Sequence, residues 1–351
     1  MKKRLGLAVL TASLSFGGAH AATYTALYSF GDSLSDVGNV YAASKLAAEA
    51  GQIPSPYPIS PPYYQGRFSN GPNWVDDLSA KLGLGPVTAS ADGGGDFAVG
   101  GAQTGPTSVN PGVPLVDLNY QVQEFKVLDP SPATGALYTL DIGANDIGAA
   151  LSAYAKNPPL DLESFVAQAA TNAIGAIDAL YADGARDLLY YEVPDLSVVP
   201  DFKAAGPLGG ELAEQFNTAV LAGIKPLEAT GLTVFDVPIF STIDQIVADP
   251  AAFGLTNVSS PCFSGDFSTQ GSVCADPDKS LFWDGEHPTA AAHALTADIA
   301  FDVLTGRSIN PGDPVATPEA STWAMMLIGF AGLSFASWRA RGVRMAQASI
   351  R

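Results

Sequence analysis

Residues 24–39, YTALYSFGDSLSDVGN, contain a short apolar segment that leads directly into a glycine turn carrying a serine. The segment 24–30 has the length and the near-continuous apolar character of a strand covered on both faces. Ser33 follows it in Gly31-Asp32-Ser33-Leu34, before a predicted helix. Parallel α/β sheets present catalytic groups just past the carboxyl ends of their strands. The alternative role for Ser33 is an ordinary helix N-cap.

The rest of the chain repeats this alternation of short apolar segments and longer helical ones. Further buried strands are predicted at 96–99, 136–142, 187–193 and 232–237. Helices are predicted at 163–182, 211–229 and 290–304. Strands that alternate with helices form a parallel sheet with helices on both faces. The pattern therefore predicts one three-layer α/β/α domain with a central parallel sheet of five strands.

The composition is strongly acidic. The chain has 17 Lys and Arg against 35 Asp and Glu, a formal net charge of -18. An anionic surface disfavours binding to nucleic acid and electrostatic docking on anionic lipid.

The first 21 residues have the pattern of a signal peptide. Lys2, Lys3 and Arg4 precede the apolar residues 5–16, and Ala19-His20-Ala21 offers the small residues of a cleavage site. An N-terminal membrane helix is the alternative, but the apolar run is short. We therefore expect export, with signal peptidase as a partner and a mature folded domain over residues 22–307.

Export permits disulfides, and the only two cysteines in the sequence are Cys262 and Cys274. They lie twelve residues apart in a loop rich in Ser, Gly and Asp. We expect a disulfide between them, and two free thiols are the alternative. A metal site is not predicted, because no third or fourth soft ligand lies near them.

Histidine is scarce, which narrows the choice of a catalytic base. The sequence has three histidines, and His20 leaves with the signal peptide. His287 follows Asp284 by three residues, a spacing that can place the carboxylate beside the imidazole within one turn. His293 lies in an alanine-rich helical segment without a nearby acid, so we expect a structural role for it.

The segment 51–71 is rich in proline and in the tyrosines Tyr57, Tyr63 and Tyr64. A linker is one interpretation. The aromatic residues favour an ordered loop packed over the domain near the first strand.

Four motifs in order resemble the GDSL, or SGNH, hydrolase family, whereas the Gly-x-Ser-x-Gly elbow of common α/β hydrolases is missing from the sequence. The motifs are residues 30–39, residues 95–102 (GDFAVGGA), Gly143-Ala144-Asn145-Asp146 and Asp284-Gly285-Glu286-His287. The similarity extends over about residues 24–304. It implies the flavodoxin-like fold of SGNH hydrolases, and no cofactor or metal.

The resemblance also implies roles for individual residues. Ser33 would be the nucleophile, with Asp284 and His287 completing a catalytic triad. The oxyanion hole would use the N–H of Ser33, the N–H of a glycine and the side-chain amide of Asn145. The glycine is Gly100 or Gly101, and Gly101 is favoured. Asp96 departs from the family pattern, in which Asn often precedes the aromatic residue.

The C-terminal segment resembles a second known element, the PEP-CTERM sorting signal. A linker at 308–317 precedes Pro318-Glu319 and an uncharged segment at 320–338, which arginines follow at once. Nineteen uncharged residues are just long enough to span a bilayer, and a buried helix is the alternative. Ala320 stands where the signal usually has a second proline. The resemblance implies an exosortase-type processing enzyme as a partner.

These features predict an exported serine ester hydrolase that cleaves carboxylic esters through an acyl-enzyme on Ser33. The expected substrate is a lipid ester or a short-chain acyl ester. One alternative is a polysaccharide acetylesterase that acts on envelope or extracellular glycans. A second is a surface-attached binding or matrix protein on an inactive hydrolase fold, which would require the loss of a triad residue.

Overall fold

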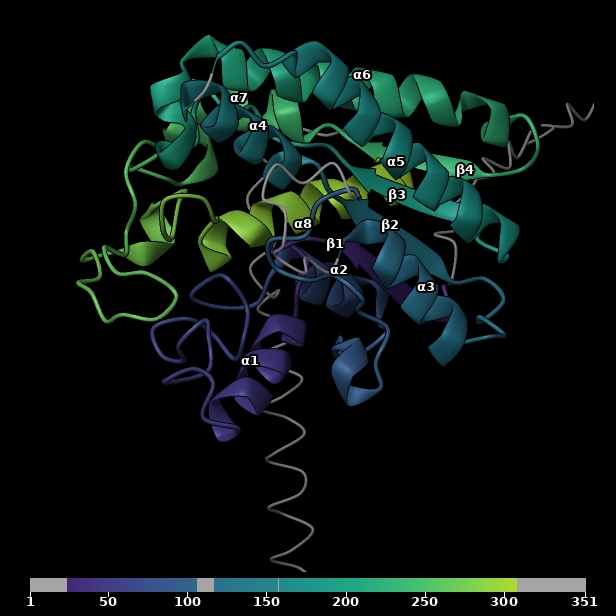
Figure 1. Ribbon diagram of the computed structural model, residues 1–351, viewed down its shortest axis with the longest axis horizontal. Helices are drawn as coiled ribbons and strands as arrows, with labels where there is room; N and C mark the ends of the chain where they lie inside the picture. Colours follow the sequence, from purple (N-terminus) through teal and green to yellow (C-terminus); the bar gives the residue numbers. More distant parts are fainter. Residues whose placement is uncertain (1–23, 106–116, 157, 308–351) are drawn as a thin grey trace, which may run out of the picture. The chain divides into compact units, whose positions relative to one another are not determined.

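The computed structural model describes residues 24–105, 117–156 and 158–307, and Figure 1 shows a parallel sheet between helices. Within these residues the strands are β1 (Leu27–Gly31), β2 (Leu137–Asp141), β3 (Asp187–Tyr191) and β4 (Thr233–Val237), paired in the order β1-β2-β3-β4. The helices are α1 (Asn39–Glu49), α2 (Trp74–Leu82), α3 (Leu118–Leu128), α4 (Ala144–Lys156), α5 (Leu162–Ala182), α6 (Pro207–Glu228), α7 (Ile239–Ala248) and α8 (Ala290–Thr305).

Two adjacent tyrosines of β3 demonstrate the three layers. Successive side chains of a strand point to opposite faces of the sheet. The Tyr190 hydroxyl donates to Asn217 of α6 at 3.0 Å. The Tyr191 ring stacks on Trp74 of α2 at 4.5 Å between centroids. Helices α4, α5 and α6 pack on one another at the face of the sheet to which Tyr190 points. Helix α2 packs with α8 at the face to which Tyr191 points (Figure 1).

The strands end level with one another. Gly31 pairs with Asp141, Asp141 with Tyr191, and Tyr191 with Val237. The residues that follow these four positions therefore leave the sheet at the same side, where the carboxyl ends of the strands lie. This alignment brings Ser33, which follows β1, close to Asn145, which follows β2.

The sheet has four strands in the described residues, so the prediction of five is wrong in one element. Residues 95–99 do run parallel beside β1. The N–H of Ser29 donates to the carbonyl oxygen of Gly95, and the N–H of Phe97 donates to the carbonyl oxygen of Ser29. The segment forms only an isolated bridge, Ser29 with Asp96. Glycines at 93–95 and 100–101 interrupt the extended backbone on both sides, which prevents a regular strand.

The predicted helices correspond closely to α5, α6 and α8, and the helix expected after the Ser33 turn is α1, whereas α2 to α4 and α7 were not predicted. Helix α8 begins at the N-cap Thr289, whose side chain accepts from Ala292 N–H, and it ends at the left-handed Gly306. The shorter α2 has a capping box between Asn73 and Asp76. Contrary to the prediction of a buried strand, β4 is an edge strand in which only the final Val237 is fully buried.

Three predicted segments lie outside the described residues. They are the signal peptide at 1–21, the linker at 308–317 and the uncharged segment at 320–338. Among the residues that are described, no helix is both long enough and apolar enough to cross a bilayer.

Candidate active site

Ser33 lies in a tight turn that requires glycine at its start. Gly31 has φ +146°, and a Cβ on it would lie 2.0 Å from the carbonyl oxygen of Asp141 on β2. After this close approach, Asp32 accepts the N–H of Leu34 through its side chain at 3.1 Å. Helix α1 starts only at Asn39, and its N-cap is Gly38. Ser33 is therefore not a helix N-cap in this structure.

Ser33, His287 and Asp284 form one hydrogen-bonded chain. His287 Nε2 lies 2.8 Å from Ser33 Oγ, across 254 residues of sequence. On the other side of the ring, His287 Nδ1 lies 2.9 Å from each carboxylate oxygen of Asp284. The imidazole is 3% exposed and Asp284 is 5% exposed. The arrangement can take a proton from the serine hydroxyl and stabilise the imidazolium that results.

The surroundings of Asp284 favour its ionised form. Its Oδ1 accepts the N–H groups of Glu286 at 2.9 Å and His287 at 2.8 Å. Burial alone would raise the pKa of Asp284, but the charge of His287 and these hydrogen bonds hold it below the ordinary value. Burial likewise acts to lower the pKa of His287, and the nearby Asp284 carboxylate reverses this and raises it.

His293 lies apart from this chain of hydrogen bonds. It is buried on α8, and among the described residues its Nδ1 has no hydrogen-bond partner. Burial, followed by the charge of His287, lowers the pKa of His293 to about 3. At neutral pH its imidazole is therefore uncharged.

The two candidate glycines of the oxyanion hole differ in their hydrogen bonding. The N–H of Gly100 donates to Asp36 at 2.9 Å, so it is already occupied. The N–H groups of Ser33 and Gly101 have no acceptor within the described part of the chain. Gly101 has φ +80°, and the position of its missing Cβ faces open space. These observations favour Gly101 over Gly100 as the donor.

Asn145 lines the same pocket as Ser33, at the start of α4. Its amide nitrogen donates to Asp32 Oδ2 at 3.2 Å and to the carbonyl oxygen of Ala102 at 3.1 Å. Both amide hydrogens are therefore in use. To bind an oxyanion, the amide has to give up one of these partners.

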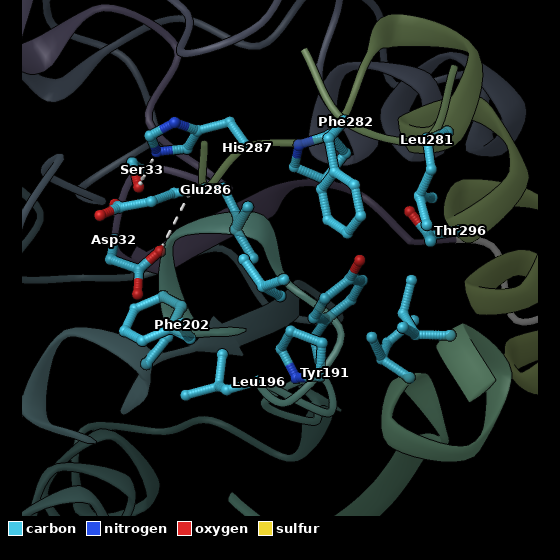
Figure 2. Close-up of a pocket in the computed structure, with 18 of the residues that line it drawn as sticks. Asp32, Ser33, Tyr191, Leu196, Phe202, Leu281, Phe282, Glu286, His287 and Thr296 are labelled. Atoms are coloured by element: carbon cyan, nitrogen blue, oxygen red, sulfur yellow. Dashed lines mark hydrogen bonds between the residues drawn. The ribbon is translucent and has the colours of Figure 1, made fainter. Parts of the chain in front are cut away.

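A largely apolar pocket opens beside Ser33. Figure 2 shows Ser33 and His287 on one side of it and Leu281 and Thr296 on the opposite side. The apolar lining residues include Leu196, Phe202, Ile239, Ile243, Leu281 and Phe282. A pocket with this lining suits an apolar ligand group.

A family model described as GDSL-like lipase/acylhydrolase matches residues 27–300. The chain belongs to this family. It is therefore a carboxylic ester hydrolase with the expected parallel α/β fold.

Two curated relatives and one solved structure illustrate the similarity. The phosphatidylcholine-sterol acyltransferase of Aeromonas hydrophila is 29% identical over 313 residues, which cover 87% of this chain and 85% of the relative. GDSL esterase/lipase 6 of Arabidopsis thaliana is 25% identical over 317 residues, which cover 78% of this chain and 85% of the relative. A lipolytic G-D-S-L family protein from Veillonella parvula aligns over 80% of this chain and 97% of its own, with 13% identity and a TM-score of 0.41.

Asp96, the departure from the GDSL family pattern, joins the first two motifs. Its side chain is fully buried, and Oδ2 accepts the N–H of Val37 at 2.9 Å. The Asn39 amide donates to the carbonyl oxygens of Asp96 and Ala98, each at 2.8 Å. Burial, with the charge of Asp36, raises the pKa of Asp96 well above its ordinary value. The carboxyl group is thus a structural element that ties the two loops together.

A buried carboxyl pair lies beneath the GDSL serine, and sequence reasoning missed it. Burial and then the Asp141 carboxylate raise the pKa of Asp32 well above its ordinary value. Asp141 also accepts a hydrogen bond from the Ser35 hydroxyl. Two buried carboxyl groups in contact cannot both be fully ionised at moderate pH. The amide of Asn145 therefore donates to a carboxyl group whose ionisation is disfavoured by burial and by the neighbouring Asp141.

Cys262 and Cys274 are joined by a disulfide. It closes a loop that carries Phe267, whose ring lies 5.7 Å from the His287 ring between centroids. Phe68 contacts both of these rings, at 5.3 Å and 5.2 Å. Among the described residues, no group of His, Cys, Asp or Glu side chains is arranged to hold a metal ion.

Proposed function

We propose that this protein is an exported serine hydrolase of lipid or other apolar acyl esters, which acts through an acyl-enzyme on Ser33. One observation carries the proposal: the Ser33–His287–Asp284 chain lies at the edge of an apolar pocket. Acyl transfer to serine requires a nucleophile, a base, an orienting acid and donors for an oxyanion. Each of these groups has a candidate here.

In the proposed reaction, Ser33 Oγ attacks the ester carbonyl carbon while His287 Nε2 takes the hydroxyl proton. The carbonyl oxygen becomes an oxyanion, which the N–H groups of Ser33 and Gly101 bind together with the amide of Asn145. The tetrahedral intermediate collapses, and His287 gives its proton to the leaving alcohol. Water then attacks the acyl-enzyme by the same route, which releases the acid and restores Ser33.

The pocket supports an acyl chain as the group that determines substrate choice. Leu281 and Thr296 lie across the pocket from Ser33 (Figure 2), so a chain bound there would extend away from the reacting carbonyl. An acetyl group on Ser33 would leave the apolar side chains on the far side of the pocket without a contact. The Aeromonas hydrophila relative is named for acyl transfer from phosphatidylcholine to a sterol. That name supports lipid esters as the first class to test here.

A chain-length series tests the function. Purified protein and its Ser33→Ala variant are compared on p-nitrophenyl acetate, p-nitrophenyl decanoate and acetylated xylan. We expect decanoate to have the higher kcat/KM and the variant to be inactive. A preference for acetylated xylan would favour the glycan esterase instead. Wild-type protein that turns over none of the three would favour a binding protein on an inactive fold.

We propose that the protein is located in the cell envelope. Residues 1–21 would direct export with cleavage by signal peptidase, and residues 320–338 followed by arginines would anchor the chain in the inner membrane. An exosortase-type enzyme would then cut near Pro318-Glu319 and release the domain. A disulfide between Cys262 and Cys274 suits an oxidising compartment. Mass spectrometry of the mature C-terminus, with and without the processing enzyme, tests the cleavage. Retention of Trp338 in both would leave a permanent anchor.

A further inference from the structure

Tyr63 lies deep in the domain although it belongs to the proline-rich loop. Its side chain is 1% exposed. The ring packs edge-on against Phe263 at 5.6 Å and against Trp283 at 6.2 Å between centroids. The neighbouring backbone is held as well, since Ile59 N–H donates to the carbonyl oxygen of Phe267 at 2.9 Å. The tyrosine ring is thus held between Trp283 and the disulfide-closed loop.

The hydroxyl of this clamped ring reaches the triad acid. Tyr63 Oη donates to Asp284 Oδ2 at 2.7 Å, across 221 residues of sequence. The backbone N–H groups of Glu286 and His287 donate to Oδ1, whereas the Tyr63 hydroxyl donates to the other carboxylate oxygen, Oδ2. Burial, followed by the Asp284 charge, raises the pKa of Tyr63, so the hydroxyl keeps its proton throughout the working pH range.

We propose that Tyr63 is a positioning residue of the catalytic relay, which holds the Asp284 carboxylate in the orientation that His287 requires. This inference rests on the proposed function, because it assigns a task to the same triad. The carboxylate has one oxygen fixed by backbone N–H groups and the other by the tyrosine hydroxyl. Without the tyrosine hydroxyl, Oδ2 would keep only its contact with His287 Nδ1, and the carboxylate would be held less firmly against rotation.

The hydroxyl also shares the negative charge of Asp284. Its removal leaves more of that charge to the imidazolium, so the pKa of His287 rises further. The other ionisable groups near this relay are Glu286, Asp201, Asp266 and His293. None of these groups changes in the variant Tyr63→Phe, which keeps the packed ring and removes the hydroxyl alone.

The test compares wild type, Tyr63→Phe and the control Tyr57→Phe on p-nitrophenyl decanoate from about pH 5 to about pH 9. Tyr57 belongs to the same loop, and its side chain is 41% exposed. We expect Tyr63→Phe to lower kcat about tenfold with little change in KM. The acid limb of kcat/KM should move up by about half a pH unit. Tyr57→Phe should match wild type in both respects.

Three outcomes separate the possibilities. If Tyr63→Phe retains the wild-type kcat and acid limb, the hydroxyl has no part in the relay and the inference is wrong. A lower Tm with an unmoved acid limb would make Tyr63 a packing residue, which also overturns it. The proposed function has a separate test: an active Ser33→Ala protein would refute it, whatever the result for Tyr63→Phe.

Discussion

Replacement of Asn145 by alanine tests the oxyanion hole, and the structure supplies the magnitude. A side-chain amide in such a site contributes about 3 kcal/mol to the transition state. Here the amide must first give up one of its two hydrogen bonds, to Asp32 at 3.2 Å or to the carbonyl oxygen of Ala102 at 3.1 Å. The loss of that hydrogen bond costs about 1 kcal/mol. The remaining 2 kcal/mol or so corresponds to a roughly thirtyfold fall in kcat.

The assay measures kcat and KM of Asn145→Ala on p-nitrophenyl decanoate. We expect KM to stay near the wild-type value, because the amide binds the oxyanion and not the ground-state ester. Asn172→Ala is the matched control, since Asn172 lies on α5 and is not among the residues that line the pocket. A rise in KM at constant kcat would place Asn145 in substrate binding. An unchanged kcat would mean that the amide stays on Asp32 and Ala102 throughout the reaction.

Three further predictions concern the triad, its pH dependence and the disulfide. Ser33→Ala and His287→Ala should each remove almost all esterase activity and leave the circular dichroism spectrum intact, whereas His293→Ala should stay active; substantial turnover by Ser33→Ala would refute the assignment. Because the carboxylate partner raises the pKa of His287 against the effect of burial, kcat/KM should fall with decreasing pH through a midpoint above the ordinary value of about 6.5; a midpoint below it in a pH–rate profile would contradict this. The double variant Cys262→Ser/Cys274→Ser should lose up to about 3 kcal/mol in urea unfolding, since the bond closes a short loop; an unchanged unfolding midpoint would show that the disulfide adds no stability, and two alkylated thiols in native protein would refute the bond itself.

Much of the fold could be predicted from the sequence because its strands and longest helices are encoded locally. Residues 24–30 and 136–142 each contain an apolar segment that corresponds to a fully buried strand, β1 and β2. Helix α8 begins at the predicted residue, because Thr289 supplies the N-cap through a contact within its own turn. The spacing of Asp284 and His287 is likewise local, so it was visible without a fold. The scarcity of histidine then left few candidates for a base.

The tertiary structure decided what depends on two distant segments at once. Gly100 and Gly101 are equivalent as sequence, and they differ only because Asp36 from the first motif occupies one N–H. Residues 96–99 have the composition of a strand, yet flanking glycines and side-chain contacts with the first motif leave an isolated bridge.

Tyr63 gave no signal beyond its place in an aromatic loop, because its partner lies 221 residues away. A hydrogen bond of this kind depends on the packing of both segments against the core, and neither segment encodes it alone. The same holds for the apolar pocket beside Ser33, whose lining residues come from separate helices and loops. The sequence by itself thus determined the strands, the long helices and the identity of the reacting groups, since these follow from local contacts and residue chemistry. Their distances, their charge states and the groups that hold them were decided by the fold.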